Sequence, residues 1–194
     1  VPIVANSKAA LTQILSLMGD KDVYKGDLFR REVSELRDQI YEGLKEQWPS
    51  ELYALEAMRS VLPRCTVTCW DPTVPTYRAF RGFPSYQPRT FMHPHGWSGL
   101  GFGFPASLGA KLAVPQSPVV CIAGDGGFQM TMAELATCVE NHIPVKFAII
   151  NNNFLGMVRQ WQEFFYDKSY VATHYTHNPD FVKLAEAFGM LGLR

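Results

Sequence analysis

The chain has 194 residues, of which 47% are hydrophobic and 19% charged, and its 18 basic residues balance 18 acidic ones. That length is enough for one sizeable domain with a buried core, and the composition excludes a disordered chain. The balanced charge gives no indication of a nucleic-acid or membrane surface, and the longest apolar runs are too short to cross a bilayer.

The N-terminal segment predicts a domain boundary. A helix is expected over residues 7–18, followed by a charged, glycine-containing linker over residues 19–27. We therefore take residues 1–18 as the tail of a preceding central domain and residues 28–194 as a separate domain.

Two helices should open this second domain. From Phe29 to Leu44, apolar residues recur at steps of three and four, which is typical of one helix face, and Asp27 can cap that helix. A further helix, with Ser50 as its cap, should end near Leu62.

The middle of the chain predicts one strand, one long loop and one helix. The strand is CTVTCW, residues 65–70, and the loop is the proline- and arginine-rich stretch 71–91. Loops of that length in compact domains tend to be functional or mobile. A helix then covers residues 105–113, since proline fits the first turn of a helix.

The second half alternates between strands and helices. The run SPVVCIA, residues 117–123, is wholly apolar, as expected of a parallel strand covered on both faces. The Gly-Asp-Gly-Gly turn at 124–127 and a helix over 129–142 follow, then a second strand at 145–150 and a helix at 155–166. This pattern predicts an α/β fold with a doubly wound parallel sheet and helices on both faces.

Two turns leave the carboxyl ends of these successive strands, one carrying Asp125 and the other Asn152. One strand–helix–strand unit separates them, so both side chains should reach the sheet edge where ligands bind in such folds. The glycines allow close approach of an anion and expose N–H groups at a helix N-terminus. A carboxylate and an amide oxygen are hard ligands for Mg²⁺ bound with phosphate. Either turn by itself is usually only a turn, but the pair predicts a phosphate-plus-magnesium site.

Gly-Asp-Gly followed by Asn-Asn at this separation resembles the thiamine-diphosphate motif, and residues 96–166 resemble acetolactate (acetohydroxyacid) synthases almost throughout. The similarity extends to Arg194 and is weak before Pro88. It implies the thiamine-diphosphate-binding fold and an enzyme, a transferase or lyase, of branched-chain amino acid biosynthesis. Such an enzyme decarboxylates a 2-oxo acid such as pyruvate and ligates the remaining fragment to a second carbonyl.

The resemblance also implies roles for particular residues. Magnesium would be held by Asp125, Asn152 and the backbone carbonyl of Phe154. Met157 and Trp161 would line the acceptor pocket, although amphipathic helices commonly use such residues for core packing. The cofactor-binding positions would be Ser98, Leu100, Gly124, Asp125, Gly126, Gly127, Met130, Asn152, Phe154 and Gly156.

The parent enzyme implied by the resemblance is larger than this chain. Its activating glutamate belongs to a separate domain of a partner subunit, so we expect no catalytic residue here and no turnover by this fragment alone. The parent is expected to be a homodimer or homotetramer with the cofactor at a subunit interface, and FAD could bind its middle domain. The family domain normally continues through another strand and helix, so a truncated C-terminus is expected.

Two stretches depart from the family pattern. A Gln-His-Gln stretch of the family is replaced by residues 71–77, which weakens the assignment of the substrate. The usual Ser-Gly-Gly is replaced by residues 93–98, where His93 and His95 could relay protons or bind phosphate or substrate. Loop histidines with ordinary hydrogen bonds are the alternative interpretation.

The compartment follows from two observations. No signal peptide is recognisable at the N-terminus. The cysteines form no CxxC pair and are expected to be free thiols in a reducing compartment, which indicates the cytoplasm. They are Cys65, Cys69, Cys121 and Cys138.

Three alternatives remain open. The first is a decarboxylase of the benzoylformate or pyruvate type that does not ligate. The second is an NAD-dependent dehydrogenase, because Gly101, Gly103 and Ala106 match a GxGxxA fingerprint and Asp125 follows at a suitable distance. That fingerprint must follow a strand, and residues 91–98 do not resemble one. The third is a non-catalytic binding module.

Overall fold

The computed structural model describes residues 4–18 and 26–194, and the chain divides into two compact units, Val1–Glu46 and Gln47–Arg194. The first contains helix α1 (Ser7–Met18), which has the predicted bounds and is capped by Asn6, whose Oδ1 accepts from the Lys8 N–H at 3.1 Å. Residues 19–25 of the predicted linker lie outside the described residues.

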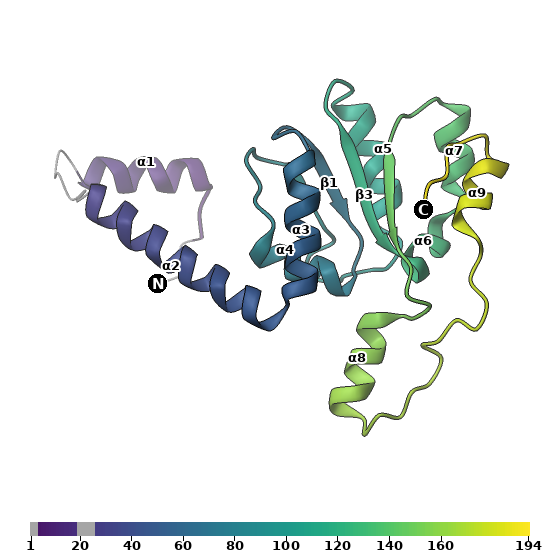
Figure 1. The fold of residues 1–194 in the computed structure, drawn as a ribbon. Helices are drawn as coiled ribbons and strands as arrows, with labels where there is room; N and C mark the ends of the chain where they lie inside the picture. The colour runs from purple at the N-terminus through teal and green to yellow at the C-terminus, as the bar shows by residue number, and fades with distance from the viewer. Residues whose placement is uncertain (1–3, 19–25) are drawn as a thin grey trace. The chain divides into compact units, whose positions relative to one another are not determined.

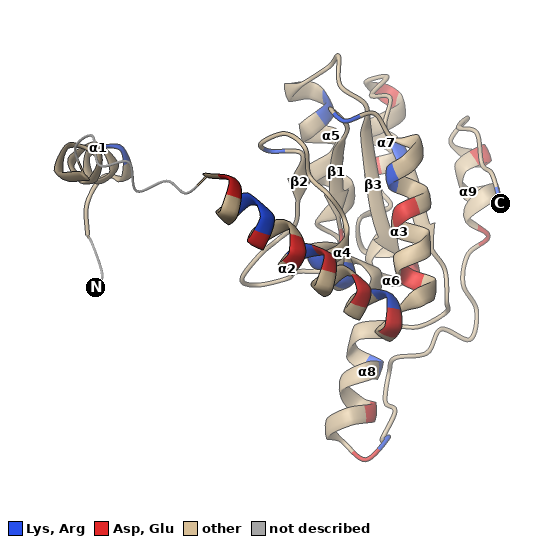
Figure 2. Ribbon diagram, turned by 60° about the vertical axis from the view of Figure 1, so that its left-hand side comes forward, with Lys and Arg blue, Asp and Glu red and all other residues tan. Residues whose placement is uncertain are grey.

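Helix α2 (Gly26–Gln47) carries charges of both signs along its length (Figure 2). Asp27 lies in its first turn, where a carboxylate favours the helix dipole, and is not the cap that the sequence predicted. Helix α3 (Pro49–Val61) follows, with Trp48 at the cap position, so the prediction of Ser50 as its cap is also wrong. Proline begins this helix because its missing N–H costs nothing there.

The second unit is built on a four-stranded parallel sheet with the order β2-β1-β3-β4. The strands are β1 (Val67–Trp70), β2 (Phe91–Met92), β3 (Val119–Gly124) and β4 (Lys146–Ile150). The predicted parallel sheet is confirmed. Strand β2 was not predicted, and it pairs with β1 at the edge of the sheet.

Side chains that alternate along the strands build a core on each face of the sheet. Cys69 and Cys121 point to the face covered by α5 (Gly103–Ala113), α6 (Asp125–Thr131), α7 (Glu134–Glu140) and α9 (Phe181–Ala187). Trp70 and Ile122 point to the other face, against α3 and α4 (Val74–Gly82). Helices thus cover both faces (Figure 1), which confirms the doubly wound α/β fold.

Three segments differ from the predicted elements. The stretch 71–91 is not a continuous loop, because it contains α4, whose N-terminus is capped by the Thr73 hydroxyl accepting from the Thr76 N–H at 3.1 Å. The helix predicted over 129–142 is two helices, α6 and α7, and Asp125 already opens α6. Helix α9 was not predicted, whereas α8 (Gly156–Phe165) lies within its predicted range.

Within the described ranges, no helix has the length and apolarity needed to cross a membrane.

Candidate functional site

A pocket opens at the carboxyl ends of β1, β3 and β4. From β1 the chain moves to β2 on one side, and the later strands β3 and β4 extend the sheet on the other, so this is the point where strand order reverses. Ligands of open α/β sheets bind at such points. The pocket is walled by residues 72–75 after β1 and 124–127 after β3, by residues 150, 152 and 154–158 around β4 and α8, and by Leu100.

Asp125 and Asn152 meet at this pocket. Asp125 is buried, and its Oδ2 accepts the backbone N–H of Asn153 at 2.9 Å. The Asn152 side chain accepts the N–H of Phe154 at 3.0 Å, which turns the backbone immediately after β4. All three of Asp125, Asn152 and Phe154 line the pocket, as their positions at neighbouring strand ends require.

The two glycines after Asp125 are enforced by packing. A Cβ on Gly126 would lie 2.6 Å from Leu155 Cδ2 and 3.0 Å from the Tyr175 hydroxyl, and a Cβ on Gly127 would overlap Asp71 Oδ2. Both glycines belong to the first turn of α6, whose backbone N–H groups have no partner inside the helix. The pocket therefore has a wall of bare backbone that carries the first N–H groups of α6.

The other residues predicted from the sequence divide into two groups. Leu100, Gly124, Gly156 and Met157 line the pocket together with the residues described above. Ser98, Met130 and Trp161 do not line it. Ser98 has a positive φ of 52° in the turn before Leu100, and Met130 lies on α6 next to that turn, 3.2 Å from the position of a Cβ on Gly101.

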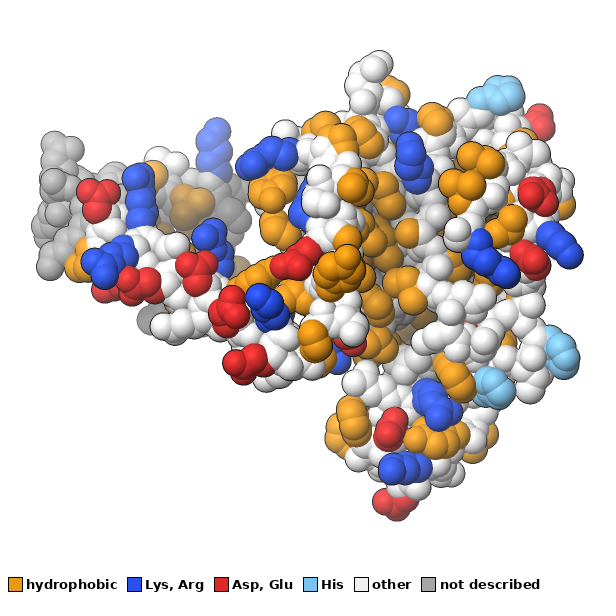
Figure 3. All heavy atoms as spheres, in the orientation of Figure 1, with side chains coloured by type: hydrophobic (Ala, Val, Ile, Leu, Met, Phe, Trp, Pro, Cys, Tyr) orange, Lys and Arg blue, Asp and Glu red, His pale blue; other side chains and the backbone are white. Residues whose placement is uncertain are grey.

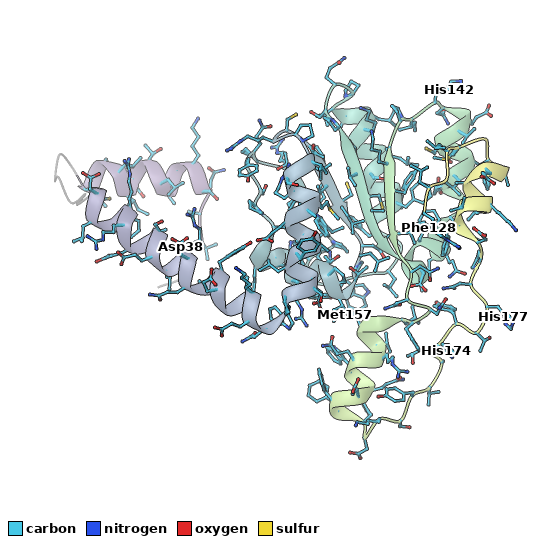
Figure 4. The ribbon with its side chains drawn as sticks, in the orientation of Figure 1. Asp38, Phe128, His142, Met157, His174 and His177 are labelled. Atoms are coloured by element: carbon cyan, nitrogen blue, oxygen red, sulfur yellow. The ribbon has the colours of Figure 1, made fainter. Side chains whose placement is uncertain are left out.

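A second, more open groove lies along α8 and is lined by Trp161. Met157 and Val158 line both the groove and the pocket, so the two hollows adjoin at the start of α8, where Figure 4 labels Met157. Large apolar side chains remain exposed around this helix (Figure 3), among them Trp161 and Phe164. Trp161 is thus placed to contact a molecule that extends from the pocket along α8.

Asp71 closes the N-terminus of α5. Its Oδ1 accepts the Gly103 N–H at 2.9 Å, and the carboxylate is buried with no basic side chain of the described residues paired to it. Burial raises the pKa of this carboxyl, and the backbone N–H groups of residues 101–103 oppose that shift. A dinucleotide pyrophosphate would need the same N–H groups. The fingerprint must also follow a strand directly, whereas ten residues separate β2 from α5. The GxGxxA match therefore does not form a dinucleotide site.

His93 and His95 lie beyond β2 and do not line the pocket. His93 is buried, its Nδ1 is 3.1 Å from the carbonyl oxygen of Trp70, and its ring packs edge-on against Phe80 with centroids 4.8 Å apart. Burial lowers the pKa of His93, the bond to Trp70 opposes this, and His95 adds to it. The arrangement is that of a buried structural histidine.

Sequence reasoning missed Asn178, Gln129 and Tyr175. The Nδ2 of Asn178 is 2.6 Å from Asp125 Oδ2, and the Nε2 of Gln129 is 3.1 Å from Asn178 Oδ1. The Tyr175 hydroxyl lies against Gly126. No local pattern marks these residues, since Asn178 and Tyr175 are about fifty positions from their partners.

The donor set fits a hard cation bound together with phosphate. In the described part of the chain, no three His, Cys, Asp or Glu side chains lie close enough to hold a metal. The pocket is lined by Asp125, Asn152 and Phe154, which can offer one carboxylate, one amide oxygen and one backbone carbonyl. Mg²⁺ accepts such a partial oxygen shell and completes it with water and substrate phosphates. Nothing in this donor set would favour a soft metal.

A doubly wound sheet with this pocket defines a protein that binds a phosphate-bearing cofactor at the strand ends. Residues 75–194, more than half of the chain, match the family described as thiamine pyrophosphate enzyme, C-terminal TPP binding domain. The chain belongs to this family, and the resemblance recognised in the sequence is confirmed.

Curated relatives extend the comparison. Acetolactate synthase of Mycobacterium leprae (strain TN) is 38% identical over 212 residues, covering 100% of this chain and 33% of that protein. The isozyme 3 large subunit of acetolactate synthase from Escherichia coli (strain K12) is 33% identical over 206 residues, covering 100% of this chain and 35% of that protein. The chain thus spans about a third of the length of these relatives.

A solved structure supports the fold. The thiamine diphosphate-dependent 4-hydroxybenzoylformate decarboxylase of Rhodococcus jostii RHA1 superposes with a TM-score of 0.65 at 26% identity, covering 72% of this chain and 26% of that one. Together with the acetolactate synthase relatives, this match leaves no support for the NAD-dependent alternative and does not favour the decarboxylase over the synthase.

Proposed function

We propose that the pocket holds thiamine diphosphate with Mg²⁺. Asp125, Asn152 and the carbonyl of Phe154 would hold the cation, and the N–H groups of Gly126 and Gly127 would bind the diphosphate. The observation that supports this most strongly is the meeting of Asp125 and Asn152, 27 residues apart, in one pocket beside a wall of bare backbone.

The remaining contacts belong to the organic part of the cofactor. Leu100 lines the pocket and would support the bent cofactor. Ser98 and Met130 would lie beside the aminopyrimidine, and Gly124 and Gly156 close to the diphosphate. When bound, thiamine diphosphate supplies a nucleophilic carbon and an electron sink for decarboxylation of a 2-oxo acid. The apolar side chains of Leu100 and Met157 would exclude water from that carbon.

We further propose that the parent protein is an acetolactate synthase that acts on pyruvate or a similar 2-oxo acid in branched-chain amino acid biosynthesis. The relatives over the full chain support this assignment. Met157 and Trp161 would contact the acceptor, and the activating glutamate would come from another domain of a partner subunit in a homodimer or homotetramer. FAD, if present, would bind outside this domain. The free cysteines agree with the cytoplasm.

Thermal unfolding of the chain with and without Mg²⁺ and thiamine diphosphate tests the cofactor site. A ligand at 100 times its Kd stabilises a protein by about 2.7 kcal/mol, so the wild-type Tm should rise measurably. Asp125→Ala should abolish the rise. Asp38→Ala, which removes an exposed carboxylate of α2, is the control and should retain it. If the Tm of the wild-type chain did not rise with Mg²⁺ and thiamine diphosphate, the proposal would be refuted.

A decarboxylase that does not ligate is the alternative that the altered stretch 71–77 leaves open, and the comparisons do not favour it over the synthase. Products of the parent enzyme with pyruvate separate the two, because a synthase forms acetolactate and a decarboxylase forms acetaldehyde.

A further inference from the structure

The chain returns to the pocket after α8. Its segment 173–175 runs antiparallel to residues 153–155, with the Leu155 N–H donating to the Thr173 carbonyl at 2.9 Å and the Tyr175 N–H donating to the Asn153 carbonyl at 2.8 Å. The His174 ring stacks on Phe154 with centroids 4.8 Å apart, and Figure 4 labels His174 on this returning segment. We call residues 173–178 the return segment.

Asn178 ends the return segment and reaches the pocket's carboxylate. Its Nδ2 lies 2.6 Å from Asp125 Oδ2, 2.9 Å from Asn153 Oδ1 and 3.0 Å from Asn151 Oδ1. An amide nitrogen has two hydrogens, so it can serve two of these three oxygens at a time. The bond to the carboxylate is the shortest and is charge-assisted, so we take it as the dominant one.

Asn178 is itself held in place. Gln129 of α6 donates from Nε2 to Asn178 Oδ1 and to the backbone carbonyl of Asp125, both at 3.1 Å. The amide of Asn178 is therefore oriented with its nitrogen towards Asp125, and the return segment is tied to the helix that begins at the same aspartate.

The two carboxylate oxygens of Asp125 differ in their hydrogen bonds. Oδ2 accepts two hydrogen bonds, from the Asn153 N–H at 2.9 Å and from Asn178. No hydrogen bond among residues 4–18 and 26–194 involves Oδ1 of Asp125. A carboxylate fixed in this way has one oxygen committed to protein donors and the other available to a cation.

We propose that Asn178 is a positioning residue that keeps Asp125 a ligand through Oδ1 alone and thereby favours Mg²⁺ over larger cations. This inference rests on the proposed function, since it concerns the same cation. Mg²⁺ demands near-ideal octahedral geometry, whereas Ca²⁺ accepts bidentate carboxylates and irregular shells. Without Asn178, Oδ2 would lose one of its two donors and the carboxylate would be free to turn towards bidentate binding.

The test compares Asn178→Ala with wild type by thermal unfolding of the chain at a fixed concentration of thiamine diphosphate, with Mg²⁺ or Ca²⁺ titrated separately. We expect the half-saturating Mg²⁺ concentration to rise about 10–100-fold, the usual effect of removing a residue that orients a metal ligand. The half-saturating Ca²⁺ concentration should rise by a smaller factor. The change in the ratio of the two is the decisive readout, because general loosening of the fold would weaken both cations equally.

Asn141→Ala is the matched control. Asn141 also donates a hydrogen bond from its Nδ2, to the Thr137 carbonyl at 2.9 Å, but it is exposed at the end of α7. This variant should keep the wild-type ratio. Gln129→Ala removes the hydrogen bond that holds Asn178 but keeps Asn178 itself. It should change the ratio of half-saturating Ca²⁺ to Mg²⁺ concentrations in the same direction as Asn178→Ala, by a smaller factor. This variant tests the role of Asn178 if Asn178→Ala does not fold.

The outcomes separate the two proposals. If wild type is stabilised by Mg²⁺ with thiamine diphosphate but the variants keep the wild-type ratio of Ca²⁺ to Mg²⁺, the role of Asn178 is refuted and the cofactor site stands. If wild type shows no stabilisation by either cation, the proposed function itself fails.

Discussion

Oδ2 of Asp71 occupies the space that a side chain on Gly127 would need. The aspartate follows β1 and the glycine lies in α6 after β3, so the contact joins two adjacent strand ends. Oδ1 of the same carboxylate accepts the Gly103 N–H, while Oδ2 is buried and has no hydrogen-bond partner in the part of the chain that the structure describes. The pocket wall and the N-terminus of α5 are thereby built around one buried carboxyl group.

Gly127→Ala should therefore destabilise the fold. The new methyl group and the Asp71 carboxylate cannot share one space, and overpacking of this kind typically costs about 1–3 kcal/mol. Urea unfolding measures the loss. Gly109→Ala is the control, because no atom lies within 4 Å of a Cβ at that position in α5, and alanine is the better helix former.

The same contact predicts non-additivity. Asp71→Ser shortens the side chain that Gly127→Ala collides with, so the double variant should lose less stability than the sum of the single variants. Strict additivity would mean that the two residues do not compete for this space.

The parallel sheet and the meeting of its strand ends could be predicted because they follow from simple patterns. Two largely apolar runs separated by a helical stretch are expected to pair in parallel and to end at one edge of the sheet, as β3 and β4 do. This brings Asp125 and Asn152 together whatever the loops do.

Other features depend on packing that no local pattern encodes. Gly126 and Gly127 disfavour a helix by themselves, but Leu155 and Asp71 leave no room for side chains where α6 begins. Helix α4 did carry a local signal, since Thr73 caps the helix and Pro75 lies in its first turn. The many prolines around it concealed that signal. Asn178 lies 53 residues from Asp125 and could not be found from spacing.

The stability of the chain should depend on pH through His93. Burial lowers the pKa of His93 in the folded state below its ordinary value of about 6.5. In the window between these two pKa values the unfolded chain binds a proton that the folded chain does not, so the free energy of unfolding falls as pH decreases through 6.5. The slope cannot exceed about 1.4 kcal/mol per pH unit for one such group.

Thermal unfolding from pH 7.5 to 5.5 compares wild type with two variants. His93→Asn can keep the hydrogen bond to the Trp70 carbonyl without a titrating ring, so its Tm should depend less on pH. His177→Asn removes an exposed histidine and should retain the wild-type slope. Equal slopes in all three proteins would show that His93 does not contribute.

The two hollows at α8 should separate cofactor binding from acceptor binding in the parent enzyme. Trp161 lines only the outer groove. Trp161→Ala should therefore raise KM for the 2-oxo acid about 10-fold, which is the lower end for loss of an apolar pocket contact. The half-saturating thiamine diphosphate concentration should stay unchanged. Met157 lines both hollows, so Met157→Ala should raise both quantities. Phe164→Ala removes an exposed aromatic ring of α8 that lines neither hollow and should change neither. If Trp161→Ala weakened the cofactor and spared KM, the outer groove would not be the acceptor site.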